Sequence, residues 1–194
     1  MANKDAAFGM KPIRMIGGAP YTGGTSRYRI AANYGTSIFQ GDMVAQVTGG
    51  TVEVHADGGT VPIVGVFNGC QFTDPTTGEQ VFQNFYPAST NASDIIAFVV
   101  DDPNVVFEVQ ADDTFPVADL FGNFDIVYTS SGSTQTGISG AELDVTTGAT
   151  NTNLPIKAID ISQDPNNSDV GSANTNVLVV IQNSVFGVKG AGLA

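Results

Sequence analysis

Basic residues are missing from most of this 194-residue chain, which has no lysine or arginine between Arg29 and Lys157. The same stretch carries 15 acidic residues, from Asp42 to Asp144. Internal ion pairs cannot hold such a segment together, so its fold must rest on apolar burial and backbone hydrogen bonds. The net charge of −12 also repels polyanions, which argues against a nucleic-acid partner.

Residues that commonly build catalytic and metal sites are scarce, with one cysteine, one histidine and no tryptophan. A single Cys and a single His cannot supply the usual ligand set of zinc. No G-x-S-x-G motif is present to supply a nucleophile. We expect Cys70 to be buried in a strand and His55 to be exposed on the polar side of one. The sequence therefore predicts a protein that is not an enzyme, with no catalytic residue, no cofactor and no metal.

Two local patterns could still bind a ligand. The run over residues 18–25 has the spacing of a phosphate-binding loop, but Gly24 stands where the lysine is needed, so a flexible segment is the better interpretation. The acidic pairs Asp101–Asp102 and Asp112–Asp113 could hold Ca²⁺, although Asp is also common in turns. Paired carboxylates of a glycoside hydrolase are a further alternative, disfavoured by the absence of tryptophan for a sugar cleft.

Long apolar runs are also lacking. The longest, residues 95–100, falls far short of the ~20 residues that a membrane helix requires. The first residues do not contain the apolar stretch of a signal peptide. We therefore expect a protein that is made in the cytoplasm and has no membrane partner.

Strand-forming residues are what the chain has in abundance. Leucine occurs only 5 times, whereas Val, Thr, Ile and Phe are frequent. Turn signals recur about every ten residues, which is typical of an all-β fold, here an antiparallel β-sandwich or barrel. The predicted strands cover residues 27–33, 42–47, 51–56, 62–72, 81–86, 95–101, 105–111, 124–129, 141–145, 154–161 and 176–182.

Several local features are predicted within this framework. Tight hairpins are expected at Gly49–Gly50 and at residues 102–104. Gly65 and Gly69 should mark bulges or bends in one long strand. Residues 116–121 could form one short helical turn.

We expect three segments: an extended N-terminal arm (residues 1–26), a β-sandwich or barrel domain (27–186) and a flexible tail (187–194). Glycines and prolines should prevent regular structure in the arm. Five of the seven basic residues lie in the first 29 positions, three of them within the arm and singly among uncovered apolar residues. Docking onto a partner is therefore favoured over binding nucleic acid or simple solvation. The expected docking residues are Phe8, Met10, Lys11, Ile13, Arg14, Met15 and Ile16.

Four stretches resemble a family of small structural proteins of tailed bacteriophages. They are Gly-Gly-Ala-Pro-Tyr-Thr-Gly at 17–23, Gly-Cys-Gln-Phe-Thr-Asp-Pro-Thr-Thr-Gly at 69–78, Phe-Gln-Asn-Phe-Tyr-Pro at 82–87 and Val-Asp-Asp-Pro-Asn-Val at 100–105. These are strand and turn sequences that contain no catalytic signature. The resemblance extends over most of the chain.

The resemblance implies a capsid cement, or decoration, protein that binds the outer shell and stabilises contacts between major capsid subunits. Such proteins are often β-rich and trimeric, so the expected partners are the major capsid protein and further copies of the chain. The expected location is the outer surface of the virion capsid, after synthesis in the host cytoplasm. The alternatives are another virion component, such as a head fibre or tail part, and a secreted carbohydrate-binding or adhesin β module.

Overall fold

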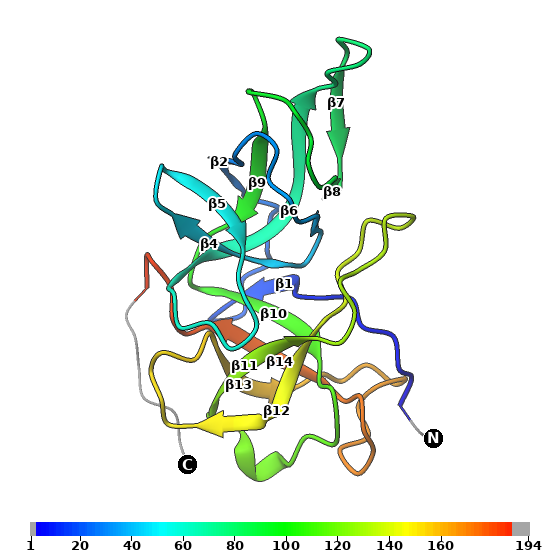
Figure 1. Ribbon diagram of the computed structural model, residues 1–194. Helices are drawn as coiled ribbons and strands as arrows, with labels where there is room; N and C mark the ends of the chain where they lie inside the picture. Colours follow the sequence, from blue (N-terminus) through cyan, green and yellow to red (C-terminus); the bar gives the residue numbers. More distant parts are fainter. Residues whose placement is uncertain (1–2, 188–194) are drawn as a thin grey trace.

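The computed structural model describes residues 3–187 and contains 14 β-strands and one short 3₁₀ turn, η1 (Val117–Asp119). The strands form two six-stranded sheets and a two-stranded ribbon, which confirms the all-β prediction. The sheets build two lobes stacked along the molecule (Figure 1). Within residues 3–187 no helix is both long and apolar enough to cross a membrane.

The upper lobe in Figure 1 contains a closed barrel in the strand order β4-β5-β2-β9-β6, because β4 pairs again with β6. All its pairings are antiparallel except that of β2 with β5. The strands of this lobe are β2 (Ser26–Arg29), β4 (Met43–Val47), β5 (Thr51–Val54), β6 (Ile63–Thr73), β7 (Gln80–Gln83) and β9 (Ile96–Val100), with the ribbon β3 (Ile38–Phe39) and β8 (Phe85–Tyr86).

The long strand β6 bends where the sequence predicts it. Its pairing with β9 shifts register between Phe67 and Gly69, and its pairing with β4 shifts next to Gly65. These irregularities let one strand serve both as a barrel wall and as half of the β6–β7 hairpin that extends beyond the barrel (Figure 1).

The lower lobe is a sheet in the order β1-β10-β14-β13-β11-β12. Its strands are β1 (Lys11–Met15), β10 (Val105–Gln110), β11 (Asn123–Tyr128), β12 (Ala141–Ala149), β13 (Ile156–Ile161) and β14 (Asn176–Ile181). The sheet curls until β10 and β12 meet at a bridge between Ala111 and Leu143, leaving β1 outside the closure. One apolar core fills this lobe and continues into the upper one through Met43, Ile63, Val66 and Val100.

Several local predictions are confirmed. β4 and β5 form the hairpin around Gly49–Gly50, both of which have positive φ. Residues 117–119 form the short helical turn. Cys70 is buried in the upper barrel, and this burial raises the pKa of its thiol to about 12.

The predicted hairpin at residues 102–104 is wrong. β9 pairs with β2 and β6, whereas β10 pairs with β1 and β14. Residues 101–104 instead carry the chain from the upper to the lower lobe. The Tyr28 hydroxyl donates a hydrogen bond to Asp101 Oδ2 (2.7 Å), and the Ile16 amide donates one to the Asn104 carbonyl (2.7 Å).

His55 was predicted to be exposed, and this is also wrong, since it is only 2% exposed. Its backbone amide donates to the Met43 carbonyl (2.8 Å), and its ring Nε2 lies 3.2 Å from the Val61 carbonyl oxygen. Burial lowers the pKa of the imidazole.

The extended N-terminal arm is not confirmed. Regular structure begins at Lys11, where β1 joins the edge of β10, despite the glycines and prolines nearby. Of the predicted tail, all but Gly187 lies outside the described residues.

Candidate functional site: the N-terminal segment and the β1–β2 loop

The N-terminal segment, residues 3–10, is fixed to the lower lobe by hydrogen bonds. The Asn3 side-chain amide donates to the carbonyls of Asp169 (2.8 Å) and Ala173 (3.0 Å). The Lys4 carbonyl accepts from the side-chain amides of Gln110 (2.9 Å) and Asn167 (2.7 Å). These long-range contacts place the segment on its own subunit.

The segment then crosses the upper lobe at a close contact between Gly9 and Gly41. The Met10 amide donates to the Gly41 carbonyl (2.9 Å). A Cβ at Gly9 would lie 2.8 Å from that carbonyl oxygen, and a Cβ at Gly41 would lie 2.9 Å from the Phe8 carbonyl oxygen. Both glycines have positive φ. The crossing buries Met10, which is 1% exposed, in the shared core.

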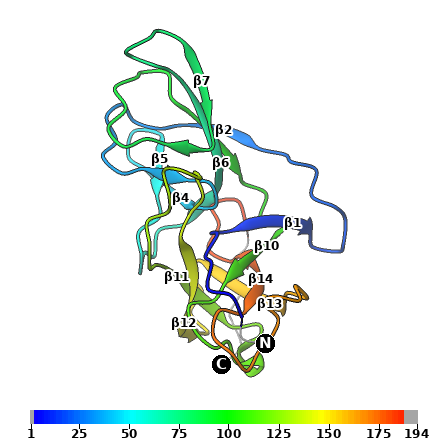
Figure 2. The ribbon, with the colours of Figure 1, turned by 90° about the vertical axis from the view of Figure 1, so that its right-hand side faces the viewer.

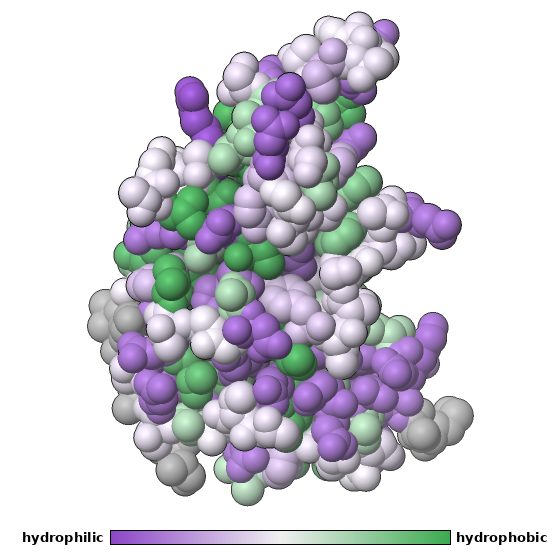
Figure 3. All heavy atoms as spheres, in the orientation of Figure 1, coloured by the Kyte–Doolittle hydropathy of each residue, from purple (hydrophilic) through white to green (hydrophobic). Residues whose placement is uncertain are grey.

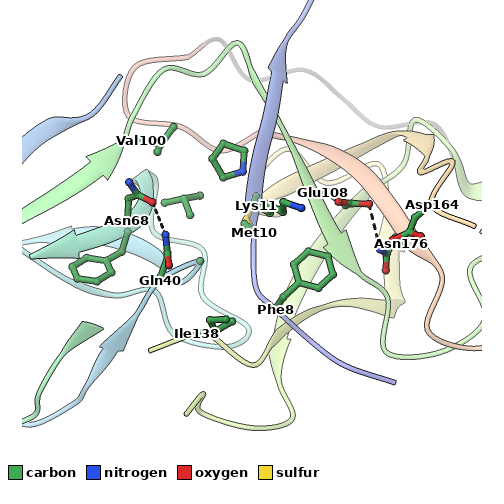
Figure 4. Close-up of a pocket in the computed structure, with 14 residues that line it drawn as sticks. Phe8, Met10, Lys11, Gln40, Asn68, Val100, Glu108, Ile138, Asp164 and Asn176 are labelled. Carbon is green, nitrogen blue, oxygen red and sulfur yellow. Dashed lines mark hydrogen bonds between the residues drawn. The ribbon is translucent and has the colours of Figure 1, made fainter. Parts of the chain in front are cut away.

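β1 follows the crossing and places opposite charges side by side. Lys11 is the register partner of Glu108 on β10. Glu108 Oε1 also accepts from Ser162 Oγ (2.5 Å) and Asn176 Nδ2 (3.2 Å). Figure 4 shows the Lys11 side chain extending from β1 toward Glu108.

A cavity of about 440 Å³ lies where the N-terminal segment meets both lobes (Figure 4). This volume is in the range of small-ligand pockets, roughly 300–1,000 Å³. Its wall is largely apolar, with a Gln40–Asn68 side-chain hydrogen bond (2.9 Å) on the upper-lobe side. The lining includes Phe8, Met10, Lys11, Val66, Val100 and Ile138.

The β1–β2 loop, residues 16–25, projects to one side of the molecule (Figure 2), while the Ile16 amide bonds to the Asn104 carbonyl and Tyr21 packs partly buried against the shared core. A Cβ added at any of its four glycines would meet no atom within 4 Å. Its base is closed by a bridge between Arg14 and Pro20 and by a hydrogen bond from the Met15 amide to the Ala19 carbonyl (2.8 Å). Ile16 is 54% exposed at its start.

Basic residues flank this loop on both sides. Lys11 and Arg14 precede it on β1, and Arg27 and Arg29 follow it on β2. The Arg27 guanidinium lies over the Phe98 ring, 5.9 Å from its centroid. Four of the seven basic residues of the chain are thus close in sequence to one protruding loop.

The structure distributes the seven predicted docking residues over several environments. Met10 is buried, and Met15 packs partly buried against the same core. Phe8 and Lys11 line the cavity. Ile13 packs on an outer cluster of β10 and β14, and Arg14 is half-buried at the base of the loop. Ile16 is exposed, as is Lys11 at the edge of the cavity.

The acidic pairs Asp101–Asp102 and Asp112–Asp113 accept hydrogen bonds that stabilise turns and connections between strands. Asp102 Oδ1 accepts from the Asn104 amide (2.8 Å), Asp113 Oδ1 from the Thr114 amide (2.7 Å) and Asp112 Oδ1 from the Val145 amide (3.0 Å). Among residues 3–187 there is no group of three or more His, Cys, Asp or Glu arranged to hold a metal ion.

Comparison with known protein families, curated proteins and solved structures found no match.

Sequence reasoning missed the far walls of the cavity. Gln40 and Asn68 come from the upper lobe, whereas Asp164 and Asn176 come from the lower one. No motif links these positions, because only the stacking of the lobes brings them together. The loop does have a signal in the sequence, namely glycine pairs between two pairs of basic residues, but the same glycines also predict the extended arm that the structure does not confirm.

Proposed function

We propose that this protein is a bacteriophage capsid cement protein, which binds the outer shell and stabilises contacts between neighbouring major capsid subunits. The observation that carries the proposal is the exposed β1–β2 loop, flanked by basic residues on a chain of net charge −12. The resemblance of residues 17–23, within this loop, to phage structural proteins supports the same role. The role requires binding and no catalysis.

Charged and apolar residues contribute differently to the proposed docking. A shell surface bearing carboxylates attracts the flanking cations, while the acidic body stays in solvent. Each exposed ion pair contributes only about 0–1 kcal/mol, so the charges mainly orient the subunit. Full burial of an aliphatic side chain such as Ile16 contributes more, roughly 1.5–3 kcal/mol.

The stacked lobes suit a subunit that holds neighbouring shell subunits together. Their apolar core is continuous, and the N-terminal segment contacts both of them. The loop is therefore presented by a connected body. We propose three copies around each local three-fold position of the shell, on the outer surface of the virion.

Replacing Ile16 with serine is expected to weaken capsid binding about tenfold, because an apolar contact is lost from the docking loop. The measurement is co-sedimentation of purified protein with capsids that lack it. Val117→Ser is the matched control, since Val117 is 52% exposed on η1, away from the loop. Equal binding of both variants, or no binding by the unmodified protein, would contradict the proposed docking.

A further inference from the structure

The strand β7 ends the upper sheet, and no strand of the described chain pairs with its outer edge. Its sequence Gln-Val-Phe-Gln contains no charge and no proline. Phe82 is 65% exposed, more than any other large apolar residue among those described. The hairpin carrying it projects from the barrel in Figure 1, and Figure 3 shows its tip mostly in pale colours, of intermediate hydropathy.

The first strand of the other sheet, β1, is protected against further pairing. It carries Lys11, Pro12 and Arg14, and its register shifts between Pro12 and Arg14. Charge, proline and irregular register are the usual means of preventing edge-to-edge association. β7 has none of them, so its edge is open to another strand.

The hydrogen-bond pattern shows which backbone groups of β7 face outward. The Asp74 amide donates to the Glu79 carbonyl (2.8 Å), which makes these residues a hydrogen-bonded pair of the β6–β7 ladder. Because such pairs alternate in antiparallel sheets, Val81 and Gln83 direct their N–H and C=O groups toward β6. Gln80 and Phe82 direct theirs toward the open edge.

We propose that β7 pairs with β7 of a second copy of this chain across a two-fold axis perpendicular to the sheet. A rotation about this axis keeps each side chain on the same face of the sheet, and residues that lie opposite each other in antiparallel strands also share a face. The residue nearest the axis must therefore lie opposite its own copy. Centring the axis on Phe82 lets the two Phe82 residues exchange both backbone hydrogen bonds. It also brings their exposed rings together as a cross-strand aromatic pair.

Electrostatics selects a second copy as the partner. A net charge of −12 opposes contact between two copies except through neutral surfaces, and β7 is such a surface. In the Phe82-centred register, Glu79 lies opposite position 85 of the other copy. The two Glu79 residues are then six positions apart along the strands, about 20 Å, which is well beyond the screening length of about 8 Å.

This contact goes beyond the proposed function and does not depend on it, because it joins copies of the chain with or without a shell. On a capsid it would link neighbouring cement subunits. In solution it would join two monomers into a dimer, and it would link units that already contain several copies into larger assemblies.

Sedimentation of the free protein over a wide concentration range tests the pairing. We expect the mass to rise with concentration and to at least double. Phe82→Pro should raise the dissociation constant roughly tenfold to a hundredfold, because it removes an outward N–H from each copy. Phe82→Ser, which keeps the N–H, should weaken pairing less. Phe186→Ser is the matched control, since Phe186 is 55% exposed elsewhere on the surface, and should have no effect.

Cysteine cross-linking tests the register. Opposed Phe82→Cys residues would have Cα atoms about 5.5 Å apart, within the range of a disulfide, so oxidation should yield a covalent dimer. Val81→Cys residues would be offset and should cross-link poorly, and the native Cys70 is buried. Preferential cross-linking through position 81, a mass that never doubles, or doubling unaffected by Phe82→Pro and Phe82→Ser would each overturn the proposal.

Discussion

Replacing Gly65 with alanine is expected to lower the free energy of unfolding by about 3 kcal/mol or more, the upper end of overpacking effects. A Cβ at this position would overlap the Val100 carbonyl oxygen and lie 2.7 Å from Val99 Cγ1 and 2.9 Å from the Asp101 Cα. Two of these three atoms, the Val100 oxygen and the Asp101 Cα, belong to the backbone of β9 and of the connection between the lobes. They cannot move away without opening the barrel or displacing the lower lobe.

Gly24→Ala is the matched control for this substitution. Gly24 lies in the β1–β2 loop, where a Cβ would meet no atom within 4 Å, and it is not among the glycines with positive φ. Its replacement should change stability by no more than about 0.5 kcal/mol. Urea unfolding of the two variants provides the measurement. Similar unfolding midpoints would contradict the close packing of β6 against β9 at Gly65.

Local patterns in the sequence were sufficient to predict most of the strands, although not β1 and β3, and the irregularities of β6. Gly65 and Gly69 mark register shifts in β6 because a long strand needs such positions to curve around a barrel. The Gly49–Gly50 hairpin also follows from local chemistry, since both residues adopt positive φ. These features depend on neighbouring residues only, so the sequence contains their signal.

Features that depend on distant parts of the chain were not predictable in this way. The Asp-Pro-Asn sequence at 102–104 favours a turn whether the flanking strands pair or separate into different lobes. His55 follows a strand with an alternating pattern, and that pattern does not reveal that the segment after it is covered. The first error arises because the flanking strands belong to different lobes. The second arises because the following residues Gly59 and Val61 lie against the His55 ring.

The candidate site also depends on contacts between distant parts of the chain. Met10 is an apolar residue in a glycine- and proline-rich region, so the sequence correctly indicates that it needs cover. It does not indicate whether the cover comes from the same chain or from a partner. The answer depends on the contact between Gly9 and Gly41, which are 32 positions apart and have no common motif. Exposed docking residues are therefore better sought in the loop after β1.

The second large effect is expected at Asp42, a buried carboxylate in the turn that presents Gly41 to the N-terminal segment. Asp42 is 2% exposed, and its Oδ2 accepts a hydrogen bond from the Phe39 amide (2.7 Å). Burial raises its pKa from 3.8 to about 6, although hydrogen bonds from Ser139 and Phe39 act in the opposite direction. The folded protein therefore holds a proton more tightly here than the unfolded chain does.

The direction of the pH dependence follows from this difference. Stability from Asp42 is fully present below the unfolded pKa of 3.8 and is lost as the pH rises through the folded pKa of about 6. Burial also raises the pKa of Glu142 to about 7, which adds to the effect in the same direction. We therefore expect the protein to be more stable in mild acid than at pH 8, the reverse of a protein stabilised by ion-paired carboxylates.

Asp42→Asn should remove the Asp42 part of this dependence, because the amide is neutral at every pH and still offers an oxygen to the Phe39 amide. The expected gain in the free energy of unfolding is about 3 kcal/mol at pH 8 and about half of that at pH 5, where the native carboxyl is largely protonated. Urea unfolding at both pH values measures the gain. Asp94→Asn is a suitable control, because hydrogen bonds from Thr73 lower the pKa of this exposed carboxyl. An equal gain in the free energy of unfolding at both pH values would show that the buried charge of Asp42 is not its cause. Only the ionised carboxylate bears the cost of burial in the turn that holds Gly41 against Met10.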